Sequence, residues 1–252
     1  MKSLILSCVA VLTAAFFTGC STYLPPGAKA DLQAFAPPSV QDGFAAKPTA
    51  PFPASIAVVR VQAPTYSNYH LRTNGGQHGN GRYSIITTRE VEKPAQIERL
   101  AALPSVAGIV ALNRMLLPQT LEGDREIREA AARLQADLIF LYTFDTAFYD
   151  HDAAKPLTVI TLGLSPTRKI TAVTTLSALL LDTRTGYIYS AYEVTERAST
   201  VSTSWGSSDS ADLTRQGNES RAFEKLVGEV TTSWHRLLAR HATPDTLTTA
   251  RP

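Results

Sequence analysis

Strand-like apolar runs alternate with helix-like apolar stripes along most of the chain, and this alternation restricts the fold more than any other feature. Ile56–Val61 is a β-branched run, and the apolar run after Asp137 is continuous enough for a buried strand. Pro94 and Asp124 each stand where a helical stripe begins, Pro94 at a first helical position and Asp124 as a fair N-cap. Residues 223–238 carry apolar side chains at helical spacing. The pattern predicts an α/β (α+β) fold, a single compact domain with a mixed β-sheet, packed helices and a long C-terminal helix.

Turn-forming residues predict a hairpin and two loops. Lys169–Leu181 and Tyr187–Arg197 flank the segment Asp182–Gly186, whose final glycine can take the left-handed conformation of a hairpin turn. Tyr66–Arg82 is rich in glycine, and Ser199–Gly217 is rich in serine, threonine and aspartate. We expect both of these segments to be loops, the first of them mobile.

Composition excludes several classes of protein. The chain has 252 residues, of which 44% are hydrophobic and 18% are charged, so it is neither collagen-like nor wholly disordered, and a polytopic membrane protein would be far more apolar. The formal net charge is +2, which does not imply a nucleic-acid partner. Two cysteines cannot build a disulfide-rich scaffold.

The first twenty residues predict export. Lys2 precedes an apolar run, Leu4–Phe17, that is too short for a spanning helix and fits a signal peptide. The ending Phe17–Cys20 resembles the lipobox of bacterial lipoproteins, although Phe17 stands where leucine is usual. The resemblance implies cleavage before Cys20, acylation of Cys20 and, because Ser21 follows it, an outer-membrane location. An ordinary signal peptide whose cleavage site contains a cysteine is the alternative.

Cleavage would leave no free thiol, because Cys8 goes with the signal peptide and Cys20 becomes a thioether. A cysteine nucleophile, a disulfide and a thiolate metal site are then excluded. Seven of the fifteen prolines lie between residues 21 and 53, which favours an extended tether. We therefore expect four parts: a signal peptide (1–19), a lipidated cysteine with a Pro/Ala-rich tether (20–53), a globular α/β domain (54–242) and a flexible tail (243–252).

The order of elements within Glu129–Val194 carries a further resemblance. An amphipathic helix ends at Arg133–Asp137 and runs into an apolar strand, and a later strand ends in the turn sequence Leu179–Gly186. A serine-rich loop and a long helix follow. This order is similar to envelope lipoproteins that include the curli secretion-channel subunit and the penicillin-binding-protein activator lipoproteins; the N-terminal domain of TolB has a related fold. The resemblance implies a small α/β sandwich and a role as an assembly factor, a pore subunit or an enzyme activator.

Motifs for catalysis or cofactor binding are weak. The most metal-like cluster is Asp145, Asp150, His151 and Asp152, but neighbouring side chains of an extended chain diverge, so a solvated loop fits better. Gly75–Gly81 lacks the lysine and the following helix of a phosphate-binding loop. We expect no metal and no cofactor.

Trp205 is the unusual residue of the expected serine-rich loop. An exposed tryptophan often anchors an interface, whereas a loop that folds back would bury it. The favoured hypothesis is a lipid-anchored, periplasm-facing envelope protein that binds another envelope protein without catalysis, through Trp205, residues 75–81 or an exposed sheet edge. One alternative is a subunit of an oligomeric outer-membrane channel, with Leu157–Leu164 and Ile170–Leu176 as arms of a membrane hairpin around Pro166. An enzyme assembled from scattered residues is the second alternative.

Overall fold

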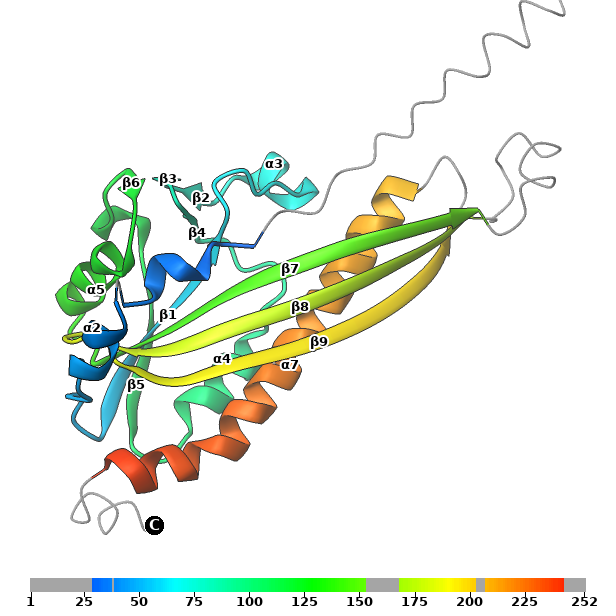
Figure 1. Cartoon of the computed structure of the whole chain (residues 1–252). Helices are drawn as coiled ribbons and strands as arrows, with labels where there is room; N and C mark the ends of the chain where they lie inside the picture. The colour runs from blue at the N-terminus through cyan, green and yellow to red at the C-terminus, as the bar shows by residue number, and fades with distance from the viewer. Residues whose placement is uncertain (1–28, 38, 153–167, 203–206, 243–252) are drawn as a thin grey trace, which may run out of the picture.

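A mixed seven-stranded β-sheet is the framework of the molecule, and it confirms the predicted α/β class with packed helices and a long C-terminal helix (Figure 1). The computed structural model describes residues 29–37, 39–152, 168–202 and 207–242. The strand order is β2-β4-β1-β7-β8-β9, and β5 also pairs with β1. The strands of this sheet are β1 (Ala54–Gln62), β2 (Gln77–His78), β4 (Ser84–Ile86), β5 (Val106–Ala111), β7 (Leu138–Asp152), β8 (Arg168–Asp182) and β9 (Ile188–Ser202), and β3 (Asn80–Gly81) pairs separately with β6 (Thr120–Leu121).

Strand β1 is the centre of the sheet. It runs parallel to β5 and β7 and antiparallel to β4. Eight of its nine residues are buried, as the β-branched run predicts, and the buried set includes the charged Arg60. A parallel neighbour on each side requires crossover connections, which α4 (Pro94–Ala101) and α5 (Asp124–Arg133) supply.

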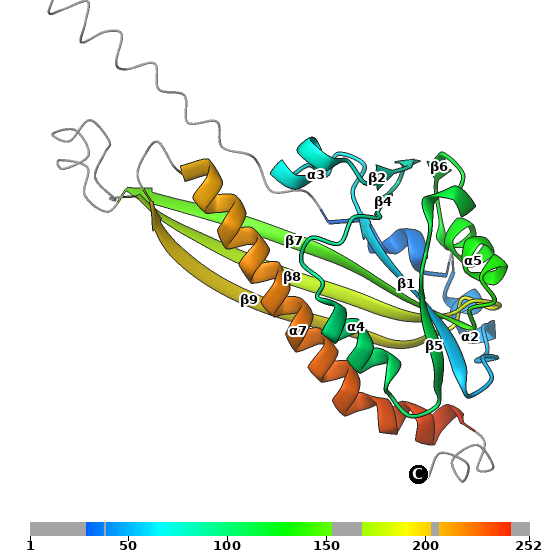
Figure 2. The same ribbon diagram turned by 180° about the vertical axis from the view of Figure 1, so that it is seen from behind.

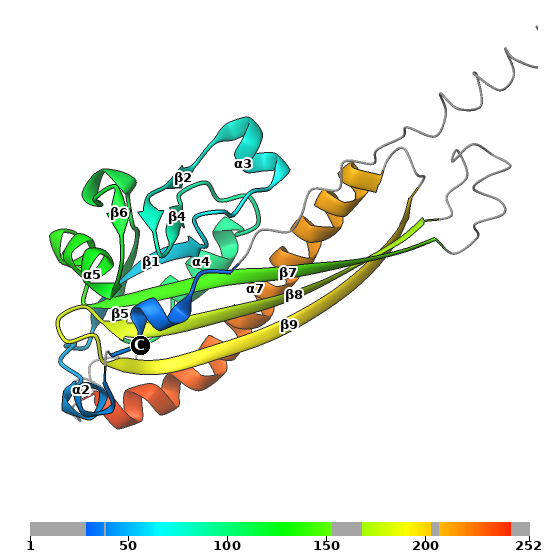
Figure 3. The same ribbon diagram turned by 45° about the horizontal axis from the view of Figure 1, so that its top comes forward.

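The last three strands form a long antiparallel ribbon, which we define as β7, β8 and β9. Each strand has 15 residues, and the β7–β8 ladder is continuous from the pair Leu138–Asp182 to the pair Asp152–Arg168. The ribbon therefore projects well beyond the rest of the sheet (Figures 1 and 3). The turn between β8 and β9 confirms the predicted hairpin, and Gly186 has the left-handed φ of 72°.

Helix α7 (Ser207–His241) lies along one face of this ribbon, as Figure 2 shows from behind. Its apolar stripe packs mainly on β8 and β9 and also reaches even-numbered residues of β7, and α4 packs beside it. Phe223 and Trp234, which both belong to the apolar stripe of residues 223–238, are fully buried there. A second core on the opposite face joins α5 to β1 and the start of β7. Shorter helices are η1 (Leu32–Phe35), α2 (Val40–Ala45), α3 (Tyr69–Asn74) and η2 (Arg114–Leu116).

The described residues of the expected tether, 29–37 and 39–53, make contacts with the rest of the domain. Phe35 and Phe52 are buried, one in each core, and burying a phenylalanine side chain stabilises a fold by about 1.5–3 kcal/mol. The backbone of Thr49 and Ala50 also donates to the carboxylate of Asp182 at 2.7 and 2.9 Å. The proline content of this segment does not indicate these contacts.

Three other local predictions were wrong. Tyr66–Arg82 is not a continuous loop, because Asn68 caps α3 by accepting from the amide of Leu71. Ser199–Gly217 contains the end of β9 and the start of α7, with residues 203–206 outside the described chain. The N-cap of α5 is Gly123, and Asp124 is its first helical residue.

The channel alternative placed residues 170–176 in one arm of a membrane hairpin, and these residues have other strand partners here. Residues 170–176 pair with residues 144–150 of β7, whereas Leu157–Leu164 lies outside the described residues. The ladder between β7 and β8 continues without a break as far as the pair Asp152–Arg168, so residues 170–176 already have a strand partner in β7. Within the described chain, none of the helices is both long enough and apolar enough to cross a membrane.

Candidate partner-binding groove

The outer edge of β9 is open along a groove of about 900 Å³. Strand β9 is the last strand in the sheet order, so its outer backbone groups have no strand partner within the described chain. Residues 189–192 line the groove together with α7 residues between 225 and 241. Successive strand residues point to opposite faces, so a hollow that touches all four must follow the strand edge rather than one face of the sheet.

The groove exists because α7 crosses the ribbon at an angle. In Figure 1 the helix begins beyond the β7 edge, passes behind the strands and emerges beyond the β9 edge. The buried stripe of α7 includes Val230 and Trp234, and the flank next to it contributes Glu229, Thr232 and Arg236 to the groove. At Gly228 an added Cβ would meet nothing within 4 Å, so the helix backbone is also approachable there.

Polar contacts fix the wall between β9 and α7. The hydroxyl groups of Tyr192 and Ser233 are 3.0 Å apart and hydrogen-bonded. Lys225 forms an ion pair with Glu196 of β9. These contacts join strand to helix, so the groove is held open by packed elements rather than by a loop.

Aromatic side chains close one end of the groove. Tyr189 stacks edge-on against His241, with ring centroids 4.9 Å apart, and its hydroxyl donates to Asp182 at 3.1 Å. Burial raises the pKa of Tyr189 to about 12, so its hydroxyl stays protonated at neutral pH. Burial, with a smaller contribution from the neighbouring Arg240, lowers the pKa of His241 and favours its neutral form.

Basic side chains dominate the groove. Lys225, Arg236 and Arg240 line it against the single carboxylate of Glu229. The guanidinium groups of Arg236 and Arg240 form no ion pair or hydrogen bond with a described residue, and the two residues stand four positions apart on the same helix flank. Two like charges at this spacing repel each other, typically by a few tenths of a kcal/mol.

A second polar assembly lies inside the molecule, and we name it the ion cluster: Arg60, Glu90, Glu92, Arg215 and Glu219. Arg215 donates to Glu219 at 2.7 Å and to both oxygens of Glu90 at 3.1 Å. Arg60 lies 3.5 Å from Glu219 and 3.7 Å from Glu90 and Glu92. All five side chains are at most 3% exposed, so the cluster is sealed and fastens α7 to β1 and the segment before α4.

The three carboxylates of the ion cluster differ in their environments. Burial raises the pKa of Glu219, and the nearby Arg215 and Arg60 reverse only part of this effect. Burial acts in the same direction on Glu90, but the Arg215 guanidinium outweighs it and lowers the pKa of that carboxyl. Tyr142 donates to Glu92 at 2.7 Å. The guanidinium of Arg60 lies 4.6 Å from the ring centre of Phe144.

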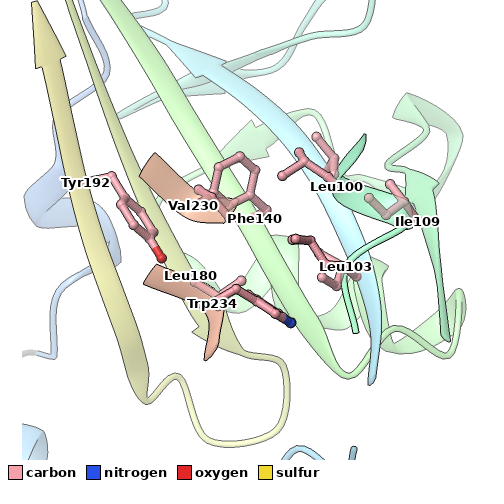
Figure 4. A pocket seen from close by; sticks show the side chains of 10 residues that line it. Leu100, Leu103, Ile109, Phe140, Leu180, Tyr192, Val230 and Trp234 are labelled. Carbon is pink, nitrogen blue, oxygen red and sulfur yellow. The ribbon is translucent and has the colours of Figure 1, made fainter. Parts of the chain in front are cut away.

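The apolar pocket between α4, α7 and the sheet is a packing gap (Figure 4). Side chains such as Leu103, Phe140 and Trp234 converge on it, and the space left among them is about 10 Å³. A volume of this size is at the lower limit for a single water molecule. It therefore offers no room for an organic substrate.

The residues singled out from the sequence do not meet in one place. Cys20 and Trp205 lie outside the described residues. Asp145 is half-exposed on β7 and pairs with Lys29 at 3.6 Å, and the side chains of Asp150–Asp152 are not among those described. Among the described side chains, no three His, Cys, Asp or Glu residues converge as a metal site would require.

Sequence reasoning missed both the groove and the ion cluster. An arginine inside the β-branched run Ile56–Val61 was the available signal for a buried charge, because such runs are normally apolar throughout. For the groove, the sequence indicated only that an exposed sheet edge could be a contact surface, without saying which edge. No protein-family model matches this chain, and comparison with curated proteins finds no relative.

Proposed function

We propose that this chain is a lipid-anchored, periplasm-facing envelope lipoprotein that binds another envelope protein and acts without catalysis, as an accessory or assembly factor. The observation that carries the proposal is the open edge of β9 beside the groove that it forms with α7. An unpaired strand edge offers a row of backbone donors and acceptors, and adding a strand to such an edge is a common way to bind an extended segment of a partner.

The open face of the ribbon supports the same proposal. Odd-numbered residues of β9 from Ala191 to Val201 are exposed on the side away from α7. Tyr149 of β7 is 52% exposed on this side, and together with Lys169, Val173 and Arg197 it lines a shallow hollow. A projecting sheet with one uncovered face and one free edge offers a large contact area for a macromolecule.

The lipid anchor would hold this domain close to the bilayer. Lys29, the first described residue, already pairs with Asp145 and lies nine positions after Cys20. A fully extended segment of that length reaches at most about 32 Å. The proposed partner is therefore itself a membrane protein or a protein held near the membrane.

Cross-linking followed by mass spectrometry on the acylated protein in native envelopes tests this function. We expect dominant cross-links from the ribbon to one different envelope protein, and we expect Cys20→Ala to release the protein from the membrane fraction. Cross-links confined to other copies of this chain would refute the accessory role and favour the oligomeric channel. An unchanged yield of partner after Trp205→Ala would exclude Trp205 as a contact residue and leave the proposed binding of another envelope protein intact.

A further inference from the structure

We infer that the groove beside β9 binds an extended acidic segment of the partner protein, which adds as a strand to the β9 edge while its carboxylates contact Arg236 and Arg240. This inference rests on the proposed function, because it names the partner chemistry of the same surface.

The first argument is geometry. The α7 wall of the groove runs from Lys225 to His241, about 24 Å at the helical rise. An extended strand covers this length with about seven residues. Residues 189–192 expose the strand edge to this space, so the occupant can pair with backbone groups on one side and meet helix side chains on the other.

The second argument is charge. Lys225 is already neutralised by Glu196, whereas Arg236 and Arg240 have no partner among the described residues. Held four positions apart on the same flank, they repel each other until an anion comes between them. A planar guanidinium binds a carboxylate with two parallel hydrogen bonds, so a segment with alternating acidic residues would satisfy both arginines.

The remaining lining selects for a peptide. Tyr189, Tyr192 and Leu237 provide apolar and aromatic surface beside the charges, and Tyr side chains contribute contact area with little loss of conformational entropy. A lone phosphate or a lipid headgroup would use the arginines but would leave the strand edge unpaired. The open edge is what commits the site to a polypeptide.

The direct test uses the full mature protein and a labelled heptapeptide, Thr-Glu-Val-Glu-Val-Glu-Thr, with binding followed by fluorescence anisotropy. We expect saturable binding that weakens with salt. We expect about a tenfold or greater loss with the double variant Arg236→Glu/Arg240→Glu. The matched control Arg72→Glu/Arg114→Glu makes the same charge change on α3 and η2, away from the groove, and should bind like the wild type.

Two altered peptides separate the two parts of the mechanism. Replacing the three glutamates by lysine should abolish binding, and N-methylation of alternate amides on the pairing side should do the same because the strand cannot then form. The inference is overturned by equal binding of the acidic and basic peptides, by no binding of the acidic one, or by equal losses in the groove variant and the control.

A photo-cross-linker at Thr232 in native envelopes keeps this inference distinct from the proposed function. Capture of an acidic segment of a different protein, lost in Arg236→Glu/Arg240→Glu, supports the inference. Capture of a different protein that survives this double variant refutes the acidic chemistry and leaves the proposed function intact. Capture of a second copy of this chain at Thr232 refutes both.

Discussion

Removing Arg215 should destabilise the fold more than any exposed charge change, because this side chain holds the ion cluster together. Its guanidinium donates to Glu90, Glu219 and Asp212 at 2.7–3.1 Å. Arg215→Met keeps most of the side-chain volume but leaves buried carboxylates facing Arg60 alone. Removing one partner of a buried ion pair costs about 3–5 kcal/mol, since the other charge stays buried without compensation.

The loss should be visible as a lower melting temperature. A domain of this size loses about 2–4 °C for each kcal/mol, so circular dichroism of the mature protein should show a drop of about 6–20 °C. Glu219→Gln in the Arg215→Met background should recover about 1–2 kcal/mol, because it removes one of the uncompensated charges.

The control is Arg125→Met on α5. Arg125 is 80% exposed and, among the described residues, its one ion-pair partner is Glu129, so its loss should change stability by less than about 0.5 kcal/mol. If Arg215→Met costs no more than this control, the ion cluster does not fasten α7. If Glu219→Gln deepens the loss instead of relieving it, the assignment of an uncompensated Glu219 is wrong.

Three other substitutions test the local structure. Burial would raise the pKa of Asp182, but hydrogen bonds from Thr49 and the following turn outweigh it and lower this pKa, so the carboxylate stabilises the fold above the unfolded-state pKa near 4. Asp182→Asn should therefore cost about 2–4 kcal/mol at pH 7. It should also flatten the fall in stability as the pH drops below about 4, measured by urea unfolding across pH. Trp234→Ala should cost about 3–5 kcal/mol in the same assay, because it leaves a cavity in the main core and removes the hydrogen bond from the indole to the carbonyl of Pro104. A loss below about 1 kcal/mol would refute the buried position of this side chain. Gly81→Ala should cost about 1–3 kcal/mol, since φ is +98° and the new Cβ would lie 2.6 Å from a backbone oxygen of β6, whereas Gly108→Ala meets nothing within 4 Å and should differ little from the wild type.

Much of the fold could be predicted from the sequence where apolar periodicity is strong. Strand β1, helix α4 and the hairpin between β8 and β9 follow from a β-branched run, an N-terminal proline and a turn that ends in glycine. These signals are local, so tertiary packing confirms them without changing them.

The start of α7 was missed because its buried face is polar. Positions 211, 215, 218 and 222 keep helical spacing, yet two of them are arginine and asparagine. Asn218 is fully buried and donates to the carbonyl of Ala172 at 2.8 Å, which satisfies its amide without apolar contact. A hydrophobic pattern cannot report a helix face that is buried through hydrogen bonds and ion pairs.

The groove could not be predicted because it depends on the angle between two elements that are each recognisable alone. Sequence patterns identify β9 and the apolar stripe of α7, but they do not say how far the helix extends past the strand edge. The unpaired arginines at 236 and 240 look like an ordinary solvated flank of a helix until β9 is placed beside them.

The two halves of α7 attach to the ribbon by different kinds of contact. From Phe223 onward, apolar side chains pack tightly on β8 and β9, so the wall that carries Arg236 and Arg240 is rigid before any partner arrives. Toward Ser207, the ion cluster and Asn218 attach the helix by polar contacts that depend on each partner being in place. A preformed groove lowers the entropy cost of binding an extended segment, since only the segment itself must become ordered. The packing that stabilises the ribbon therefore also favours the β9 edge as the surface a partner would use.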